Sequence, residues 1–214
     1  MIRANLYSSE PLEPSFKQSV SDGLDLVGQN IGGISLAKTH IVKLPVSSHN
    51  KVDVTRVGFK KFDTLTELHI MAVPLDGVYE ANAGLAYFNF GIVWLNTAIL
   101  KAKSEIRSIT AHEAAHSIGY VLPDSPQTFN VSESHCSCDD CIMYRSYSMD
   151  RDSESLIEAS QLKIDVGFRK TFKTMGIALP SEEFCTPCRA DMIDTAEENI
   201  EQLRMNRFKT GVVF

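Results

Sequence analysis

Two histidines four residues apart, with a glutamate directly after the first, stand in residues 110 to 120 (TAHEAAHSIGY). On a helix, positions i and i+4 lie on one face, so His112 and His116 can reach the same metal ion. Glu113 would lie about 100° around the helix, where it can hold a water molecule without binding the metal. The chemistry that this arrangement permits is metal-assisted hydrolysis.

A catalytic zinc needs a third protein ligand and one open position. Gly119 follows His116 by three residues and is expected to end the helix, which lets the chain turn back under the metal. In the extended motif HExxHxxGxxH the third histidine comes three residues after the glycine. This chain has Leu122 there, which cannot bind a metal. The candidates further along the chain are Asp124 and His135.

All five cysteines lie in two tight groups in the second half of the chain: Cys136, Cys138 and Cys141, then Cys185 and Cys188. An odd number of cysteines, in a chain with no evident export signal, favours metal ligation over a disulfide framework. By spacing alone, Cys138-x-x-Cys141 together with Cys185-x-x-Cys188 is a good four-cysteine zinc pattern. In that reading Cys136 is not used.

The order of these residues resembles the signature of the archaemetzincins, a branch of the metzincin zinc peptidases. That signature is HExxHxxG, then His-Cys, four further residues, Cys-x-Met and later CxxC. The matching positions are His112, Glu113, His116, Gly119, His135, Cys136, Cys141, Met143, Cys185 and Cys188. Residues 120 to 134 and 144 to 184 form longer connections than the family usually has.

The resemblance implies a zinc-dependent metallopeptidase that hydrolyses peptide bonds with a zinc-activated water. His112, His116 and His135 would bind the catalytic zinc, and Glu113 would act as the general base. Met143 would form a tight turn beneath the three histidines and ligate nothing. The expected partner is therefore a peptide or protein substrate.

The resemblance also implies a second, structural zinc, and thus two zinc ions per chain. Its ligands would be Cys136, Cys141, Cys185 and Cys188. The family pattern and the CxxC spacing pattern therefore differ in whether Cys136 or Cys138 is the fourth ligand. We favour Cys136, because it directly follows His135 and would tie the two metals together.

Composition narrows the possible partners and locations. The chain has 214 residues and a net charge of −6, which argues against a nucleic-acid partner held by phosphate contacts. No apolar run approaches the roughly 20 residues that span a bilayer, so no membrane partner is expected. The N-terminal residues lack the apolar segment of a signal peptide, which makes a cytoplasmic location the expectation.

The elements that must position these residues follow an α/β order. Helical periodicity predicts a helix over residues 13–32, and short apolar runs predict strands over 38–46 and 65–74. Residues 84–96 predict one or two strands, and 97–118 a helix that carries the HExxH motif. Further along, the pattern favours a loop over 123–152 and helices over 153–177 and 189–208.

The expected fold is α/β (α+β): a metzincin-like mixed, twisted sheet packed on the active-site helix, with C-terminal helices. We expect a single domain over residues 1–214, with the sheet and active-site helix in 1–119 and a metal-binding C-terminal subdomain in 120–214. The resemblance also implies an edge strand that pairs with an extended peptide, for which the strand at 90–96 (FGIVWLN) is the best candidate. An ordinary core strand is the alternative for these residues.

A different class of function is also compatible with the sequence. The chain could be a zinc-stabilised binding or regulatory module without peptidase activity, because Leu122 and the long connection after Gly119 both permit it. A zinc-ribbon nucleic-acid binder would need a basic face, which the charge argues against. The presence of Glu113 favours the peptidase, because a merely structural zinc site has no use for a base.

Overall fold

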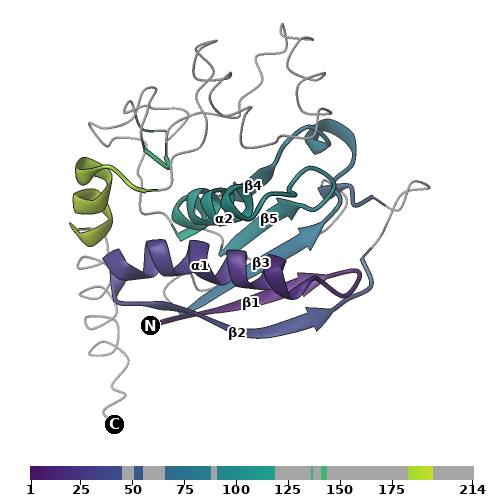
Figure 1. Ribbon diagram of the computed structural model, residues 1–214, viewed down its shortest axis with the longest axis horizontal. Coiled ribbons are helices and arrows are strands. Elements are labelled where there is room, and N and C mark those ends of the chain that lie inside the picture. Colours follow the sequence, from purple (N-terminus) through teal and green to yellow (C-terminus); the bar gives the residue numbers. More distant parts are fainter. Residues whose placement is uncertain are drawn as a thin grey trace, which may run out of the picture.

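Two helices lie against one face of a five-stranded mixed sheet (Figure 1). The computed structural model describes residues 1–44, 51–54, 66–87, 91–118, 136, 141–143 and 183–194. The strands of this part of the chain are β1 (Ile2–Ser8), β2 (Ile34–Ile41), β3 (Glu67–Val73), β4 (Gly84–Tyr87) and β5 (Ile92–Asn96). The helices that pack on the sheet are α1 (Pro14–Ile31) and α2 (Lys103–Ile118), and residues 186–194 form a further helix. The sheet order is β2-β1-β3-β5-β4, and only β4 runs antiparallel to its neighbour. The expected mixed sheet, packed on the helix that carries the HExxH motif, is confirmed.

The central strands bury side chains on both faces of the sheet. In β3, Leu68, Ile70 and Ala72 belong to the core shared with α1 and α2. Met71 and Val73 belong to a second apolar cluster on the opposite face. Successive side chains of a strand point to opposite faces, so a strand covered on both sides must be apolar along its whole length.

Helix α1 agrees with the predicted helix over 13–32, and its ends have local causes. Pro14 stands in the first turn, where its missing N–H costs nothing. Gly32 ends the helix in the left-handed conformation (φ 82°), which a glycine adopts without strain. In the middle of α1, a Cβ on Gly23 would lie 2.5 Å from the carbonyl oxygen of Arg107, so this glycine lets α1 and α2 pack closely.

The first two strands differ from the sequence predictions. No element was predicted for the N-terminal residues, yet β1 lies in the sheet between β2 and β3 and buries Ile2, Ala4 and Leu6. Strand β2 begins at Ile34, four residues before the predicted start. Its pairing with β1 begins at Ile2 and Ile34, directly after the glycines that end α1. The tertiary pairing therefore sets this boundary.

The interpretation of residues 90–96 as the edge strand is wrong, and the alternative of a core strand holds for the strand found there. Residues 92–96 form β5, which lies between β3 and β4, and all five of its side chains are buried. Among the described residues, the edge strand next to β5 is β4. The physical reason is burial on both sides, because a strand whose side chains are all buried belongs inside a sheet, whereas Leu85 and Ala86 of the short strand β4 are only partly buried, as suits an edge.

Helix α2 begins six residues later than predicted. The helix was predicted from Thr97, but residues 97–102 form a turn, and α2 begins at Lys103. The backbone N–H of Ala102 donates to the Glu105 carboxylate at 3.3 Å, which fixes the first turn of the helix. The helical periodicity of the sequence therefore extends over residues 97–102, although tertiary contacts hold these residues in a turn.

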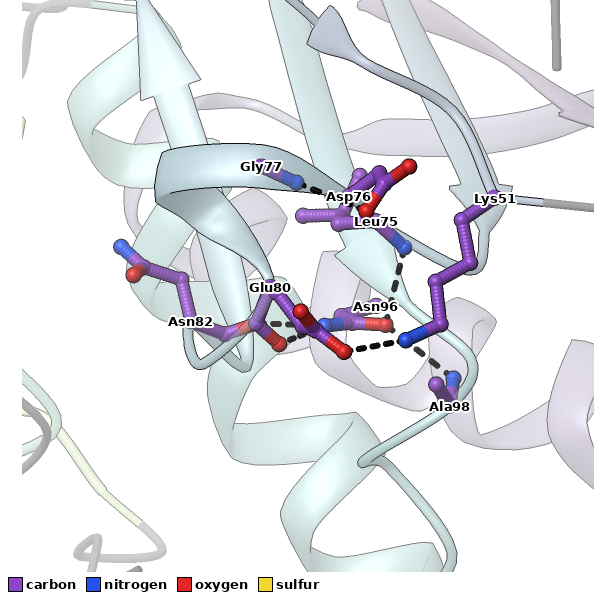
Figure 2. Close-up of polar contacts among 8 residues, drawn as sticks. All are labelled: Lys51, Leu75, Asp76, Gly77, Glu80, Asn82, Asn96 and Ala98. Atoms are coloured by element: carbon purple, nitrogen blue, oxygen red, sulfur yellow. Dashed lines mark hydrogen bonds and ion pairs between the residues drawn. The ribbon is translucent and has the colours of Figure 1, made fainter. Parts of the chain in front are cut away.

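Asn96 holds that turn, together with the segment that leads into β4, through its side-chain amide (Figure 2). Its Oδ1 accepts from the backbone N–H groups of Leu75 and Ala98, each at 3.1 Å. Its Nδ2 donates to the carbonyl oxygens of Glu80 and Asn82, each at 2.9 Å. The fully buried Asn96 side chain thus connects the ends of β3 and β5 to the start of the edge strand.

Replacement of Asn96 by alanine is expected to lower the free energy of unfolding by about 3 kcal/mol or more, because several backbone groups lose their partner and each unsatisfied group costs about 1–3 kcal/mol. Chemical denaturation followed by circular dichroism measures this loss. Asn82→Ala is the matched control, because Asn82 contributes its backbone carbonyl, which the substitution keeps. Equal stability of the two variants would show that the Asn96 amide has no such role.

The last described segment carries part of the predicted C-terminal helix. Residues 186–194 are helical, so the helix begins before the predicted position 189. The loop predicted at 123–152 lies almost entirely outside the described residues, and the helix predicted at 153–177 lies wholly outside them. Among the described residues, no helix has the length and apolar content needed to cross a membrane.

Candidate metal centre

Helix α2 brings the two histidines of the HExxH motif together. The Nε2 atoms of His112 and His116 are 3.1 Å apart, and the two rings meet edge to face at 76°. Two nitrogens that bind one tetrahedral zinc at about 2.0–2.1 Å lie about 3.3 Å from each other. The separation of these two nitrogens therefore fits a shared zinc ion.

The other ring nitrogen of His112 meets a backbone carbonyl from a distant part of the chain. His112 Nδ1 lies 2.7 Å from the carbonyl oxygen of Ile142, which can only accept, so Nδ1 carries the proton and donates it. In a neutral imidazole this leaves a lone pair on Nε2, the atom that faces His116. Histidines that bind metals commonly donate their second N–H in this way, which fixes the ring orientation.

Glu113 points away from solvent, toward the edge strand. Its side chain is buried, and it packs directly against Gly84 of β4. A Cβ at Gly84 would lie 2.7 Å from Glu113 Cγ and 2.8 Å from its Oε1, closer than real side chains come. Gly84 therefore makes room for the carboxyl. Nothing in the sequence predictions pointed to Gly84, although a glycine inside a strand can indicate such a close approach.

Burial changes the acidity of Glu113. It raises the pKa of this carboxyl to about 8, because removal of water disfavours the charged form. A cation bound by the neighbouring histidines would favour the charged form and so act in the opposite direction. Without such a cation, this carboxyl is therefore mostly protonated at neutral pH.

The end of α2 is fastened to the start of β5 by two hydrogen bonds. The buried Ser117 hydroxyl donates to the Ile92 carbonyl at 3.1 Å. The Gly91 N–H donates to the Ser117 carbonyl at 3.3 Å, and Gly91 has the positive φ of 72° that this turn requires. These contacts hold the helical turn that carries His116 against the sheet.

Four cysteine thiols form a compact group beside the described helix 186–194. The Sγ atoms of Cys136, Cys141, Cys185 and Cys188 all lie within 4.8 Å of one another. Cys136 and Cys185 are 3.6 Å apart, and none of the four is in a disulfide. Sulfurs on one tetrahedral zinc, at about 2.3 Å each, lie about 3.8 Å apart. The four thiols therefore fit a zinc ion, whereas Cys138, the alternative fourth ligand, lies outside the described residues.

Hydrogen bonds make one of these thiols unusually acidic. Cys141 Sγ receives a hydrogen bond from the Cys188 thiol and further ones from the backbone N–H groups of Cys185 and Met143, which lower the pKa of Cys141 to about 6. The partner thiol of Cys188 has a raised pKa, mainly because it donates to Cys141. A thiolate is the form that binds zinc, so backbone donors already favour the ligating state of Cys141.

Some predicted site residues fall outside the described part of the chain. These are His135, Cys138, Gly119, Leu122 and Asp124. Met143, the expected turn residue, is fully buried and directly follows Ile142, whose carbonyl meets His112. The described residues thus supply two histidines, the glutamate and four cysteines of the predicted site.

Comparison with known proteins relates this arrangement to solved structures. No family model matches the sequence, and no curated protein matches it significantly. The archaemetzincin of Methanopyrus kandleri is similar in structure, with a TM-score of 0.54 and 16% identity over 94% of this chain and 96% of that one. A zinc-dependent peptidase from Methanocorpusculum labreanum gives 0.52 and 18% over 88% and 99%. The chain therefore has an archaemetzincin-like fold.

Proposed function

We propose that the chain is a zinc-dependent metallopeptidase, with His112, His116 and His135 as ligands of the catalytic zinc and Glu113 as the general base. The observation that carries this proposal is the convergence of the His112 and His116 Nε2 atoms at 3.1 Å, next to a buried glutamate. A purely structural metal site has no use for a carboxyl that lies beside the metal without binding it. The similarity to a protein described as a zinc-dependent peptidase supports the same function.

In the proposed hydrolysis, each of these residues would have a different role. When bound, the zinc would supply Lewis-acid activation of water and of the substrate carbonyl. Glu113 would accept the proton of the attacking water and pass it to the leaving amine, which needs the carboxylate form at that moment. Gly84 keeps space for this carboxyl, and the hydrogen bond to the Ile142 carbonyl leaves the lone pair of His112 on Nε2, where it would bind the zinc.

Strand β4, rather than the strand predicted from the sequence, would hold the substrate. In the described part of the chain β4 pairs with β5 only, so its outer edge offers backbone donors and acceptors. An extended peptide can add to such an edge by main-chain hydrogen bonds. Gly84 of this strand contacts Glu113, so a peptide bound along β4 would lie close to the base.

The four cysteines would form the structural site. Cys136, Cys141, Cys185 and Cys188 would hold the second zinc as a closed tetrahedral set, with no position for water. Residues 136 and 141–143 belong to the segment that follows His135 in the sequence. A metal at the cysteines would therefore fix the part of the chain that brings the proposed third ligand to the catalytic zinc.

Two zinc ions per chain are expected after purification and dialysis, because two separate ligand sets are present. Elemental analysis against protein concentration should give a ratio near two, with the cysteines protected from alkylating reagents. A ratio of one with freely alkylated cysteines would contradict the structural site.

The activity test uses unstructured peptides, because the proposed substrate pairs in an extended conformation. We expect cleavage products by mass spectrometry, loss of cleavage on chelation of the catalytic zinc, and recovery when zinc is restored. A chain that binds two zinc ions but cleaves no peptide from a diverse mixture would instead support the binding-module alternative.

The third ligand is tested by a pair of substitutions. His135→Ala should weaken binding of the catalytic zinc markedly and leave the cysteine site filled, whereas Asp124→Ala should have little effect. Chelator competition measures both. If Asp124→Ala removes the catalytic zinc and His135→Ala does not, the assignment of the third ligand is wrong.

A further inference from the structure

The two proposed metal sites are joined by a single short segment of backbone. Ile142, whose carbonyl accepts the hydrogen bond from His112 Nδ1 at 2.7 Å, lies directly between Cys141 and Met143. Cys141 belongs to the four-thiol group. One residue thus touches a histidine of the first ligand set and adjoins a cysteine of the second.

The position of the Ile142 carbonyl depends on the cysteine group. The Met143 N–H donates to Cys141 Sγ at 3.4 Å, and the Met143 carbonyl accepts from the Cys136 N–H at 2.8 Å. The Ile142 N–H donates to the carbonyl of Glu183 at 2.9 Å, two residues before Cys185. Three of the four cysteines therefore lie at or next to the contacts that hold residues 141–143 in place.

We propose that metal binding at the four cysteines sets the metal affinity of the histidine site through the Ile142 carbonyl. This inference rests on the proposed zinc site at His112 and His116. With the carbonyl in place, His112 keeps its proton on Nδ1 and directs the Nε2 lone pair at the metal. Without it, the ring can rotate or adopt the other tautomer, in which Nε2 carries the proton and cannot bind.

The expected loss of metal affinity is estimated from other metalloproteins in which a ligating histidine donates a hydrogen bond to a second residue. Loss of the partner that orients a ligating histidine typically weakens metal affinity by about 10–100-fold. Because coupling between two binding sites is reciprocal, metal at the histidines should strengthen binding at the cysteines by the same factor. Metal at either site should therefore raise the affinity of the other site.

The first test compares metal affinities in the full chain. Starting from the two-metal protein, a chelator removes the metal from the histidine site, and zinc is titrated back in competition with that chelator. In the Cys188→Ser chains that fold, the histidine site should bind zinc about 10–100-fold more weakly. Cys138→Ser, the same substitution at the fifth cysteine, should leave this affinity unchanged. An unchanged affinity in folded Cys188→Ser would overturn the proposal.

The second test needs no substitution, so it remains valid if Cys188→Ser does not fold. Nitrogen-15 NMR of the histidine rings is recorded on the wild-type chain with metal at the cysteine site only. We expect His112 as the Nδ1–H tautomer in this form, before any metal binds its Nε2. Exchange of zinc for the larger cadmium ion at the thiols should shift the His112 Nδ1–H resonance.

His69 is the internal control for this experiment. It lies on β3, and its Nδ1 is 3.0 Å from the hydroxyl of Tyr7, which packs against the apolar cluster on the sheet face opposite α2. Its resonances should stay in place when the thiol-bound ion changes. A His112 ring that is Nε2-protonated, or whose resonances do not respond to the exchange, contradicts the coupling. Neither test measures hydrolysis, so a chain that cleaves nothing could still show the coupling.

Discussion

Glu113→Ala is expected to abolish peptide hydrolysis while both zinc ions stay bound. The substitution removes the proposed base, which contributes roughly 10²-fold or more to the rate. It leaves the metal affinity nearly unchanged, because Glu113 is not one of the proposed ligands and its side chain points toward β4. The measurement is kcat for a cleaved peptide, together with zinc content. Glu113→Gln, which keeps the volume next to Gly84, should lose as much activity.

Glu105→Gln is the matched control for these variants. Glu105 lies in the first turn of the same helix, where its carboxylate accepts from the Ala102 N–H. A glutamine can still accept this bond, so the variant should keep its activity and both metals. If Glu113→Ala left a measured peptidase activity unchanged, the proposed mechanism would be wrong and the binding-module alternative would gain support.

Cys136→Ser is expected to lose the structural zinc and much of the folded state. Cys136 is buried, and its thiol lies within the four-thiol group. Structural zinc sites contribute an apparent binding free energy of about 10–16 kcal/mol, which is as large as the whole stability of many domains, about 5–15 kcal/mol. Zinc content and thermal unfolding, followed by circular dichroism, give the two readouts.

The same substitution at Cys138 separates the two ligand patterns. Cys138→Ser should be close to neutral in zinc content and in the temperature of unfolding. The reverse result, with Cys138→Ser unfolded and Cys136→Ser intact, would show that the pairing of two CxxC motifs is correct. Cys136, which directly follows His135, would then no longer be assigned as a ligand of the structural zinc.

The sequence by itself determined the parts of the site that depend on local spacing. Positions i and i+4 of any α-helix lie on one face, so the pairing of His112 with His116 followed once a helix was predicted there. The strands at 65–74 and 84–96 and the helix over 13–32 were also found from periodicity. The choice between Cys136 and Cys138 stayed open, because spacing cannot decide which thiols meet in space.

Only the tertiary structure decided the contacts between distant residues. The order of the strands made β4 the edge and placed β5 inside, although both came from one apolar stretch. The fit of Gly84 against Glu113 and the bond from His112 to the Ile142 carbonyl join residues about 30 positions apart in the sequence. A backbone carbonyl is present at every residue, so no sequence pattern can mark the one that orients a ligand. Such contacts exist only after helices and strands have packed, because packing selects one arrangement from many that the local patterns allow.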